Sequence, residues 1–330
     1  MFWFSSFAFA ALIVLLSPLV ESTSSNTSIN TTNPITLVTA WYPHPGYNPK
    51  YPNKEEAYRR LIGEVLSRVQ TPIVIYTPSS ESEFILSSRP AGAPIIINNT
   101  YETIWDVPNL STLAASFHTD QRKIAWQDEE RTNAREDSPH MYGVWNAKVS
   151  FLNMTAMLNP FDSEYLFWHD AAASLSYNGS LESWPDPNKI SKIFSRHEGY
   201  SDKLLMVARE LQPAFPVDAS WEVAPLTRTI AGVFFGGTPR SIQWLAKEYY
   251  DMLYYYLSLN QFVGVEELLL LSIALQYPRR IVCVPCYRCS NPDARSLDHI
   301  YYYLDFLAAK KDNTLAPLFG DIPKGDPFYY

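Results

Sequence analysis

One run of sequence decides the fold class of this 330-residue chain: Tyr165-Leu166-Phe167-Trp168-His169-Asp170. Its apolar, aromatic part predicts a strand buried on both faces, as in a parallel sheet, and it ends on two groups that bind metal ions or move protons. In open α/β sheets ligands bind just outside the carboxyl ends of the strands, so a carboxylate placed there is positioned to meet one. The small residues 171–173 leave room for a bulky ligand. A carboxylate that only caps the next helix would give the same pattern.

The segments around this run predict strands and helices in alternation. Besides the strand at Tyr165, we expect strands over 35–41, 72–76, 94–97 and 230–235. We expect helices over 55–69, 141–158, 239–257 and 266–275. The polar segment 120–137 is interpreted as a surface insertion. Alternation of this kind begins a doubly wound sheet, so the predicted fold is α/β, a Rossmann-like, mostly parallel sheet flanked by helices in a single domain.

The amino-terminal segment predicts export from the cytosol. Residues 1–20 contain no charged side chain and are dominated by Phe, Ala, Leu, Ile and Val. Such a segment is either a cleaved signal peptide or an uncleaved anchor in the membrane. We therefore divide the chain into a signal peptide or signal anchor over 1–22, a flexible Ser/Thr/Asn leader over 23–34 and one domain over 35–330. The expected location is the secretory pathway, in the Golgi lumen or outside the cell.

Glycosylation sequons support that location. Their acceptors are Asn26, Asn30, Asn98, Asn109, Asn153 and Asn178. The formal net charge of −8, without any basic cluster, argues against nucleic acid as a partner. The aromatic content of 15% is explained mostly by core packing, although exposed rings also bind sugars.

All 3 cysteines of the chain lie within residues 283–289. A zinc site would need four ligands, and no second Cys or His pair stands at the usual spacing. In an oxidising compartment we expect a local disulfide and one remaining thiol, and the sequence leaves the pairing open.

Common catalytic motifs are absent from the sequence. It contains no G-x-G-x-x-G, no P-loop, no G-x-S-x-G elbow and no H-E-x-x-H. This excludes the commonest dinucleotide enzymes, phosphate-cleaving ATPases, serine esterases and zinc proteases.

Two candidate features flank the decisive strand, and each has a structural alternative. Lys148, early in the helix before the strand, is placed to reach a phosphate at the edge of the sheet, or is a solvated lysine. Asp170, together with His169, is placed to hold a divalent cation beside a diphosphate, or caps a helix.

Two more features follow further along the chain. Gly236 and Gly237 come after an apolar run, where paired glycines either bring backbone amides close to a ligand or form a tight turn. Glu266 and Glu267 begin a helix, where carboxylates suit the helix dipole and need no function, or supply a base for a substrate hydroxyl.

Taken together, five short segments resemble the HtrL/YibB-like family. They are Thr39-Ala40, Trp145-Asn146-Ala147-Lys148, Phe167-Trp168-His169-Asp170-Ala171, Phe234-Phe235-Gly236-Gly237 and Phe262-Val263-Gly264-Val265-Glu266-Glu267. That family looks like a branch of the nucleotide-diphospho-sugar transferases with the GT-A fold, and the resemblance covers about residues 35–278. This chain departs from the pattern at Ala172, where members carry Gly, and at Glu267, where they tend to carry Gln. GT-A enzymes typically present Asp-x-Asp, and Asp170 has no second carboxylate two residues on.

The resemblance implies a GT-A-like glycosyltransferase that moves a sugar from a nucleotide-diphosphate donor, expected to be a UDP-sugar, to a hydroxyl of a glycan or other acceptor. It places Thr39 and Ala40 in the nucleotide pocket, and Lys148 and Trp168 at the donor. It assigns Asp170, with His169, to a Mn²⁺ or Mg²⁺ ion on the diphosphate. It sets Gly236 and Gly237 against the donor sugar or acceptor, and Glu266 or Glu267 as the group that positions or deprotonates the acceptor.

Two alternatives remain open at this point. A non-catalytic secreted protein that binds glycans on the same fold is favoured by the missing second carboxylate. A glycoside hydrolase would need two carboxyl groups about 5 to 10 Å apart across a sugar, for which Asp170 and Glu267 are the candidates.

Overall fold

The computed structural model describes residues 34–43, 54–119, 139–171, 173, 181–196, 199–208, 230–284 and 302–308. All of them belong to one unit of mutual contacts, Thr32–Tyr330. Outside the described residues lie the export segment, the leader up to residue 33, the insertion over 120–137, the acceptors Asn26, Asn30 and Asn178, and the cysteines at 286 and 289. Among the helices of the described part, none has the length and apolar character needed to cross a membrane.

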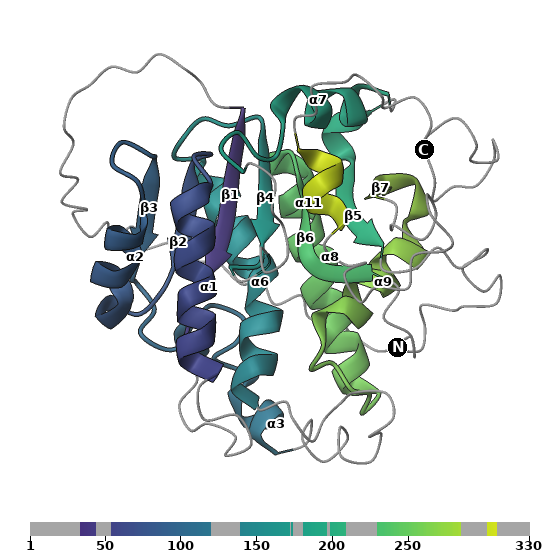
Figure 1. Cartoon of the computed structure of the whole chain (residues 1–330). Coiled ribbons are helices and arrows are strands. Elements are labelled where there is room, and N and C mark those ends of the chain that lie inside the picture. Colours follow the sequence, from purple (N-terminus) through teal and green to yellow (C-terminus); the bar gives the residue numbers. More distant parts are fainter. Residues whose placement is uncertain are drawn as a thin grey trace, which may run out of the picture. The chain divides into compact units, whose positions relative to one another are not determined.

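The described strands form one mixed sheet (Figure 1). They are β1 (Ile35–Ala40), β2 (Ile73–Tyr76), β3 (Ile95–Asn98), β4 (Tyr165–His169), β5 (Leu204–Ala208), β6 (Ile230–Gly237) and β7 (Ile281–Val284). Their order in the sheet is β3-β2-β1-β4-β6-β5-β7. Only β6 runs antiparallel to its neighbours among these strands. The predicted mostly parallel sheet is confirmed.

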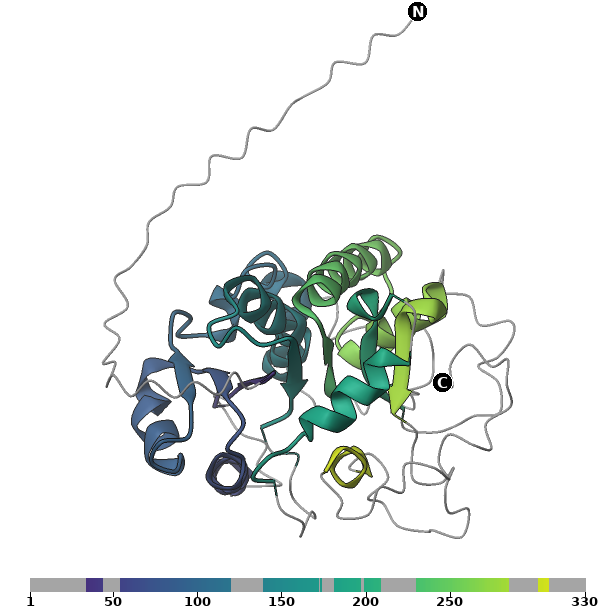
Figure 2. The same cartoon turned by 90° about the horizontal axis from the view of Figure 1, so that it is seen from above.

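Helices cover both faces of this sheet (Figure 2). One face packs against α1 (Lys54–Arg68), α7 (Pro187–Ser195) and α11 (Tyr302–Leu307). The other packs against α6 (Pro139–Leu158), α8 (Pro239–Ser258) and α9 (Glu266–Gln276). The shorter helices are α2 (Ser82–Ser88) and α3 (Ala114–His118), and the 3₁₀ turns are η1 (Ser79–Glu81), η2 (Ile104–Asp106), η3 (Tyr200–Asp202) and η4 (Pro278–Arg280).

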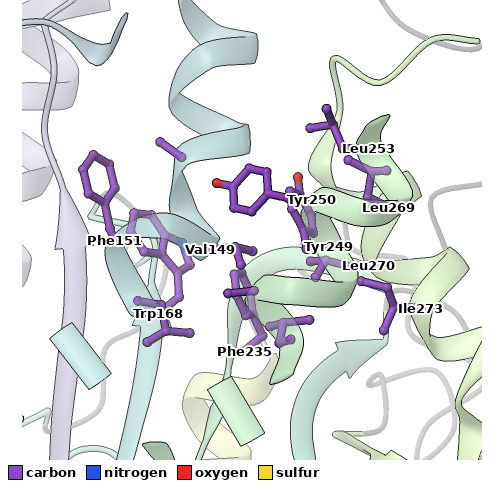
Figure 3. Close-up of a cluster of buried hydrophobic side chains, with 14 of the residues drawn as sticks. Val149, Phe151, Trp168, Phe235, Tyr249, Tyr250, Leu253, Leu269, Leu270 and Ile273 are labelled. Atoms are coloured by element: carbon purple, nitrogen blue, oxygen red, sulfur yellow. The ribbon is translucent and has the colours of Figure 1, made fainter. Parts of the chain in front are cut away.

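The alternation of side chains along β4 divides the core in two. Tyr165 and Phe167 lie on the α1 and α7 face, whereas Leu166 and Trp168 lie on the α6, α8 and α9 face. Figure 3 shows the second core. Its labelled side chains come from the sheet and the three helices: Val149, Phe151, Trp168, Phe235, Tyr249, Tyr250, Leu253, Leu269, Leu270 and Ile273. Because both faces are buried, β4 reads as a continuous apolar run.

The strand order reverses between β1 and β4. From β1 the chain continues outward through β2 and β3, and it then returns to place β4 on the other side of β1. β1 and β4 are parallel neighbours, with Val38 beside Trp168. Their carboxyl ends therefore share one edge, where Trp41 follows β1 and Asp170 follows β4. In doubly wound sheets this switch point is where ligands bind.

The structure adds elements that the sequence did not predict, and it shifts one boundary. β5 and β7 are apolar strands of 5 and 4 residues for which the sequence analysis named no strand. Gly236 and Gly237 are the last residues of β6, not a turn after it. Thr238 then caps α8 by accepting a hydrogen bond from the backbone N–H of Ser241 at 3.3 Å.

A buried arginine ties the end of α1 to the sheet. Arg89 Nη1 donates to the carbonyls of Leu66 and Val69, and Nη2 donates to those of Thr71 at 2.7 Å and Pro94 at 3.0 Å. Carbonyls at a helix end have no partner within the helix, so this guanidinium satisfies groups that burial would otherwise leave unpaired.

We expect Arg89→Met to lower the free energy of unfolding by about 2–4 kcal/mol, because several buried carbonyls lose their donor at once. Urea denaturation of the full chain measures this. Arg60→Met, at an exposed position of α1, is the matched control and should change stability by less than about 0.5 kcal/mol. Equal effects of the two substitutions would contradict the role given to Arg89.

Candidate functional site

Lys148 is the centre of a buried network beside the carboxyl end of β4. Its Nζ donates to Glu266 Oε1 at 2.6 Å and to the carbonyl of Gly232 at 3.0 Å. It also forms an ion pair with Asp170 Oδ1 at 2.9 Å. An ammonium group has three donors, so these three acceptors use all of them. The network joins α6, α9, β6 and the end of β4.

The carboxylates keep Lys148 charged. Burial on its own lowers the pKa of Lys148, but the charges of Asp170 and Glu266 and the hydrogen bonds to them raise that pKa above its ordinary value. A buried, fully bonded ammonium has no donor left for a ligand. The predicted contact between Lys148 and a donor phosphate therefore does not fit this geometry, and Lys148 acts on the site through Asp170.

Asp170 is the member of the network that reaches solvent. Its Oδ1 accepts from Lys148 and from Trp168 Nε1, the latter at 2.6 Å, and its backbone N–H donates to the carbonyl of Val233 at 2.9 Å. Its side chain is 30% exposed. Within the described part of the chain, Oδ2 has no hydrogen-bond partner. The structure therefore presents one oriented carboxylate oxygen at the switch point.

Glu266 and Glu267 lie in the first turn of α9, where they complement the helix dipole. Both are buried, and Glu266 is held by Lys148. Glu267 Oε1 accepts from the backbone N–H of Gly232 at 3.1 Å. The predicted use of either carboxylate as a base for an acceptor hydroxyl does not fit, because neither side chain faces solvent.

Gly232 is the site residue that the sequence analysis missed. Its carbonyl and its N–H bind Lys148 and Glu267, and a Cβ at this position would lie 2.1 Å from Glu266 Oε1. A glycine inside an apolar strand signals a close approach of another group. That signal was present in the sequence, but the prediction assigned the ligand contact to the paired glycines at the end of the same strand.

Gly236 and Gly237 lie at the other end of β4. β6 is antiparallel to β4 and pairs Gly237 with Leu166, whereas Asp170 meets Val233. The expectation that the two glycines contact the same ligand as Asp170 therefore disagrees with the register. A Cβ on Gly236 would lie 2.1 Å from the carbonyl oxygen of Leu166, so strand packing explains this glycine.

His169 and Thr39 face the opposite side of the sheet from Lys148. The register of β1 and β4 sets them side by side, and both line a small cavity under α1. Thr39 Oγ1 and His169 Nε2 have no hydrogen-bond partner among the described residues. The cavity has room for about one water molecule, which is too little for a nucleotide base. Ala40 lies on the other face, buried in the α6 core.

A divalent cation does not fit the residues described here. Successive strand residues point to opposite faces, so His169 cannot share a metal ion with Asp170. Oδ1 of Asp170 already accepts two donors. No group of three or more His, Cys, Asp and Glu side chains in the described ranges is arranged to hold a metal ion. Asp170 therefore offers one oxygen, and the geometry of the described residues does not support the predicted metal pair of Asp170 and His169.

Asn146 fixes the helix that carries Lys148. Its Nδ2 donates to the carbonyls of Val263 and Gly264, both at 3.1 Å, and its Oδ1 accepts from Tyr249 at 2.8 Å. These bonds tie α6 to the turn before α9 and to α8. Three of the segments quoted for the resemblance, around Lys148, Asp170 and Glu266, thus meet in space.

Comparisons with known proteins identify no family. No protein-family model matches the chain, and no curated protein matches it. Among solved structures, the chain is similar to the apo form of mouse xyloside xylosyltransferase 1, with 9% identity and a TM-score of 0.42 over 76% of this chain and 84% of that chain. A similarity of this size identifies neither a family nor a function.

We expect Gly232→Ala to destabilise the fold by about 2–4 kcal/mol, because the new methyl group displaces Glu266 from Lys148 and leaves buried charges poorly paired. Gly63→Ala is the control, since a Cβ at this position of α1 meets only ordinary contacts with α2, and the substitution should be neutral or stabilise by up to about 1 kcal/mol. Thermal and urea unfolding compare the two. A neutral Gly232→Ala variant would contradict the close packing described.

Stability should fall as the pH is lowered from about 6.5 to about 4. Burial lowers the pKa of His169 from 6.5 to about 4, partly opposed by the charge of Asp170. In this window the unfolded chain binds a proton that the folded chain does not, so stability is lost with acid, by up to about 3 kcal/mol. Urea denaturation at several pH values measures it, and His169→Leu should remove this part of the slope. An unchanged slope in the variant would contradict the assignment.

Proposed function

We propose that this protein is a glycosyltransferase of the secretory pathway, which moves a sugar from a nucleotide-diphosphate donor to a hydroxyl of a glycan or another acceptor. The observation that carries the proposal is the position of Asp170. It is a partly exposed carboxylate, held by a buried lysine, at the switch point of a mostly parallel sheet. The assignment to the HtrL/YibB-like family and the GT-A fold, and a UDP-sugar as the donor, are parts of the same proposal.

The switch point supports a ligand site at this edge of the sheet. Trp41, directly after β1, is half-buried, and its Nε1 donates to Glu81 Oε2 at 2.9 Å. Asp170, directly after β4, is fixed by Trp168 and Lys148. Trp41 packs on the α1 side of the sheet, whereas Asp170 belongs to the network on the α6 side. The oriented carboxylate of Asp170 is the kind of group that binds sugars and nucleosides, and it lies where doubly wound sheets bind their ligands.

In this proposal the described residues bind and orient the donor. Asp170 Oδ2 accepts a hydrogen bond from the ligand, and Lys148 and Trp168 hold the carboxylate in position through Oδ1. Fixing a reactant against a preorganised group lowers the entropic part of the barrier. The group that accepts the proton of the acceptor hydroxyl is not among Glu266 and Glu267, since both are buried.

A non-catalytic glycan-binding protein on the same fold is the second candidate. Two observations favour it: Ala172 stands where GT-A enzymes carry a second carboxylate, and the network carboxylates of α9 are buried. The same burial argues against a glycoside hydrolase, since Glu267 does not face Asp170 across an open site.

Calorimetric titration of UDP and GDP, with and without Mn²⁺, tests the proposal on the full chain, on Asp170→Asn and on Asp251→Asn. Asp251 is an exposed carboxylate of α8 that pairs with Lys247, so its substitution controls for the loss of charge. We expect Asp170→Asn to weaken nucleotide binding by about tenfold or more, the loss of a charge-assisted hydrogen bond, and Asp251→Asn to leave it unchanged. No binding of either nucleotide under any condition would contradict a donor site and favour the glycan-binding alternative.

A further inference from the structure

We propose that Asp170 binds a hydroxyl group of the ligand and that this binding needs no divalent cation, because Lys148 occupies the place of the cation. This inference rests on the proposed function, and it concerns the same site. It names the chemistry that Asp170 recognises: a neutral hydroxyl of a sugar or ribose, not a metal-bound diphosphate.

The ammonium group of Lys148 lies where oxygen ligands would otherwise surround a cation. Three oxygens surround Lys148 Nζ at 2.6 to 3.0 Å: Glu266 Oε1, Asp170 Oδ1 and the carbonyl of Gly232. Two carboxylates and a carbonyl are the ligand types that hard divalent cations bind. Here they all point at one permanent positive charge that belongs to the chain itself. A cation that used the same oxygens would have to displace a buried, hydrogen-bonded side chain.

Asp170 keeps one carboxylate oxygen for a ligand. Its Oδ1 accepts from an ammonium and from an indole N–H, which leaves Oδ2 as the available oxygen. Divalent cations in diphosphate sites are held by one or two carboxylates together with the phosphates, and here the positive charge of Lys148, 2.9 Å from Asp170 Oδ1, repels a second cation at this carboxylate. The neighbouring His169 faces the other core. The described residues thus supply no second ligand.

The remaining oxygen of Asp170 is best suited to one kind of ligand group. A carboxylate whose charge is already countered on one oxygen repels anions less and attracts cations less, but it remains a strong hydrogen-bond acceptor on the other. The hydroxyls of a sugar or ribose are neutral donors of the right size. The side chain is 30% exposed, so part of this carboxylate is open to a ligand, and Oδ2 is the oxygen that the network does not use. Lys148 and Trp168 are positioning residues in this arrangement.

The test uses Mn²⁺ alone and nucleotides with chelator on the full chain. Electron paramagnetic resonance should show no Mn²⁺ binding that depends on Asp170, and calorimetry in excess EDTA should give UDP-sugar affinities within about twofold of those in Mn²⁺. Asp170→Asn should weaken UDP-sugar binding by a similar factor in both conditions. Mn²⁺ bound by the wild-type chain and lost in Asp170→Asn would overturn the inference. So would UDP-sugar binding that requires Mn²⁺, although that result would leave the proposed function standing.

The variant Lys148→Ala tests directly whether the ammonium group occupies a position that a divalent cation could otherwise take. Removing the ammonium leaves Asp170 Oδ1 and Glu266 Oε1 facing each other across the vacated space, so we expect this variant to gain Mn²⁺ binding and to be stabilised against heat by the ion. Lys148→Ala combined with Glu266→Gln should lose the acquired site. A folded Lys148→Ala variant that binds no Mn²⁺ would count against the inference. The wild-type measurements decide the question independently if this variant does not fold.

Discussion

The structure of this site depends on one buried charge. Lys148 extends from α6 into the protein interior, where an unpaired ammonium would be strongly unfavourable. Its three partners come from α9, β6 and the end of β4, so pairing this charge fixes three elements relative to α6. Gly232 must lack a side chain for Glu266 to approach, and α9 must begin at Glu266 for the carboxylate to face β6. The same interaction that completes the core also sets the direction of Asp170.

The two faces of the sheet therefore have different roles. On the α6 face, charged groups converge and end at a partly exposed carboxylate at the switch point. On the α1 face, Thr39 and His169 line a small cavity, and the ring of His169 packs against Trp184 and Phe234. The alternation of residues along β4 separates neighbours in sequence, so His169 contributes to stability and Asp170 to the ligand site. A sheet covered on both faces exposes its chemistry at the ends of its strands.

The sequence predicted the architecture well because β4 and β6 are continuous apolar runs and because α1 and α8 are long helices with a periodic apolar pattern. It also singled out Lys148, Asp170, Glu266 and Glu267, which the structure brings together or holds close to the same glycine. It could not tell that β6 is antiparallel, which sends Gly236 to the far end of β4 and brings Gly232 to Asp170. It could not foresee that three acceptors would use all the donors of Lys148, because two of them, Gly232 and Glu266, lie more than 80 residues away in sequence.

The most direct test of this account is a ¹⁵N nuclear magnetic resonance spectrum of the lysine side chains, recorded in EDTA with and without a UDP-sugar. The account predicts an ammonium signal of Lys148, absent in Lys148→Ala, whose protons exchange slowly with water because they are buried and bonded to three acceptors. It also predicts that this signal shifts when the ligand binds to Asp170. A Lys148 ammonium that exchanges as fast as surface lysines, or that does not respond to a bound nucleotide sugar, would contradict the central claim that this lysine orients the carboxylate of a ligand site.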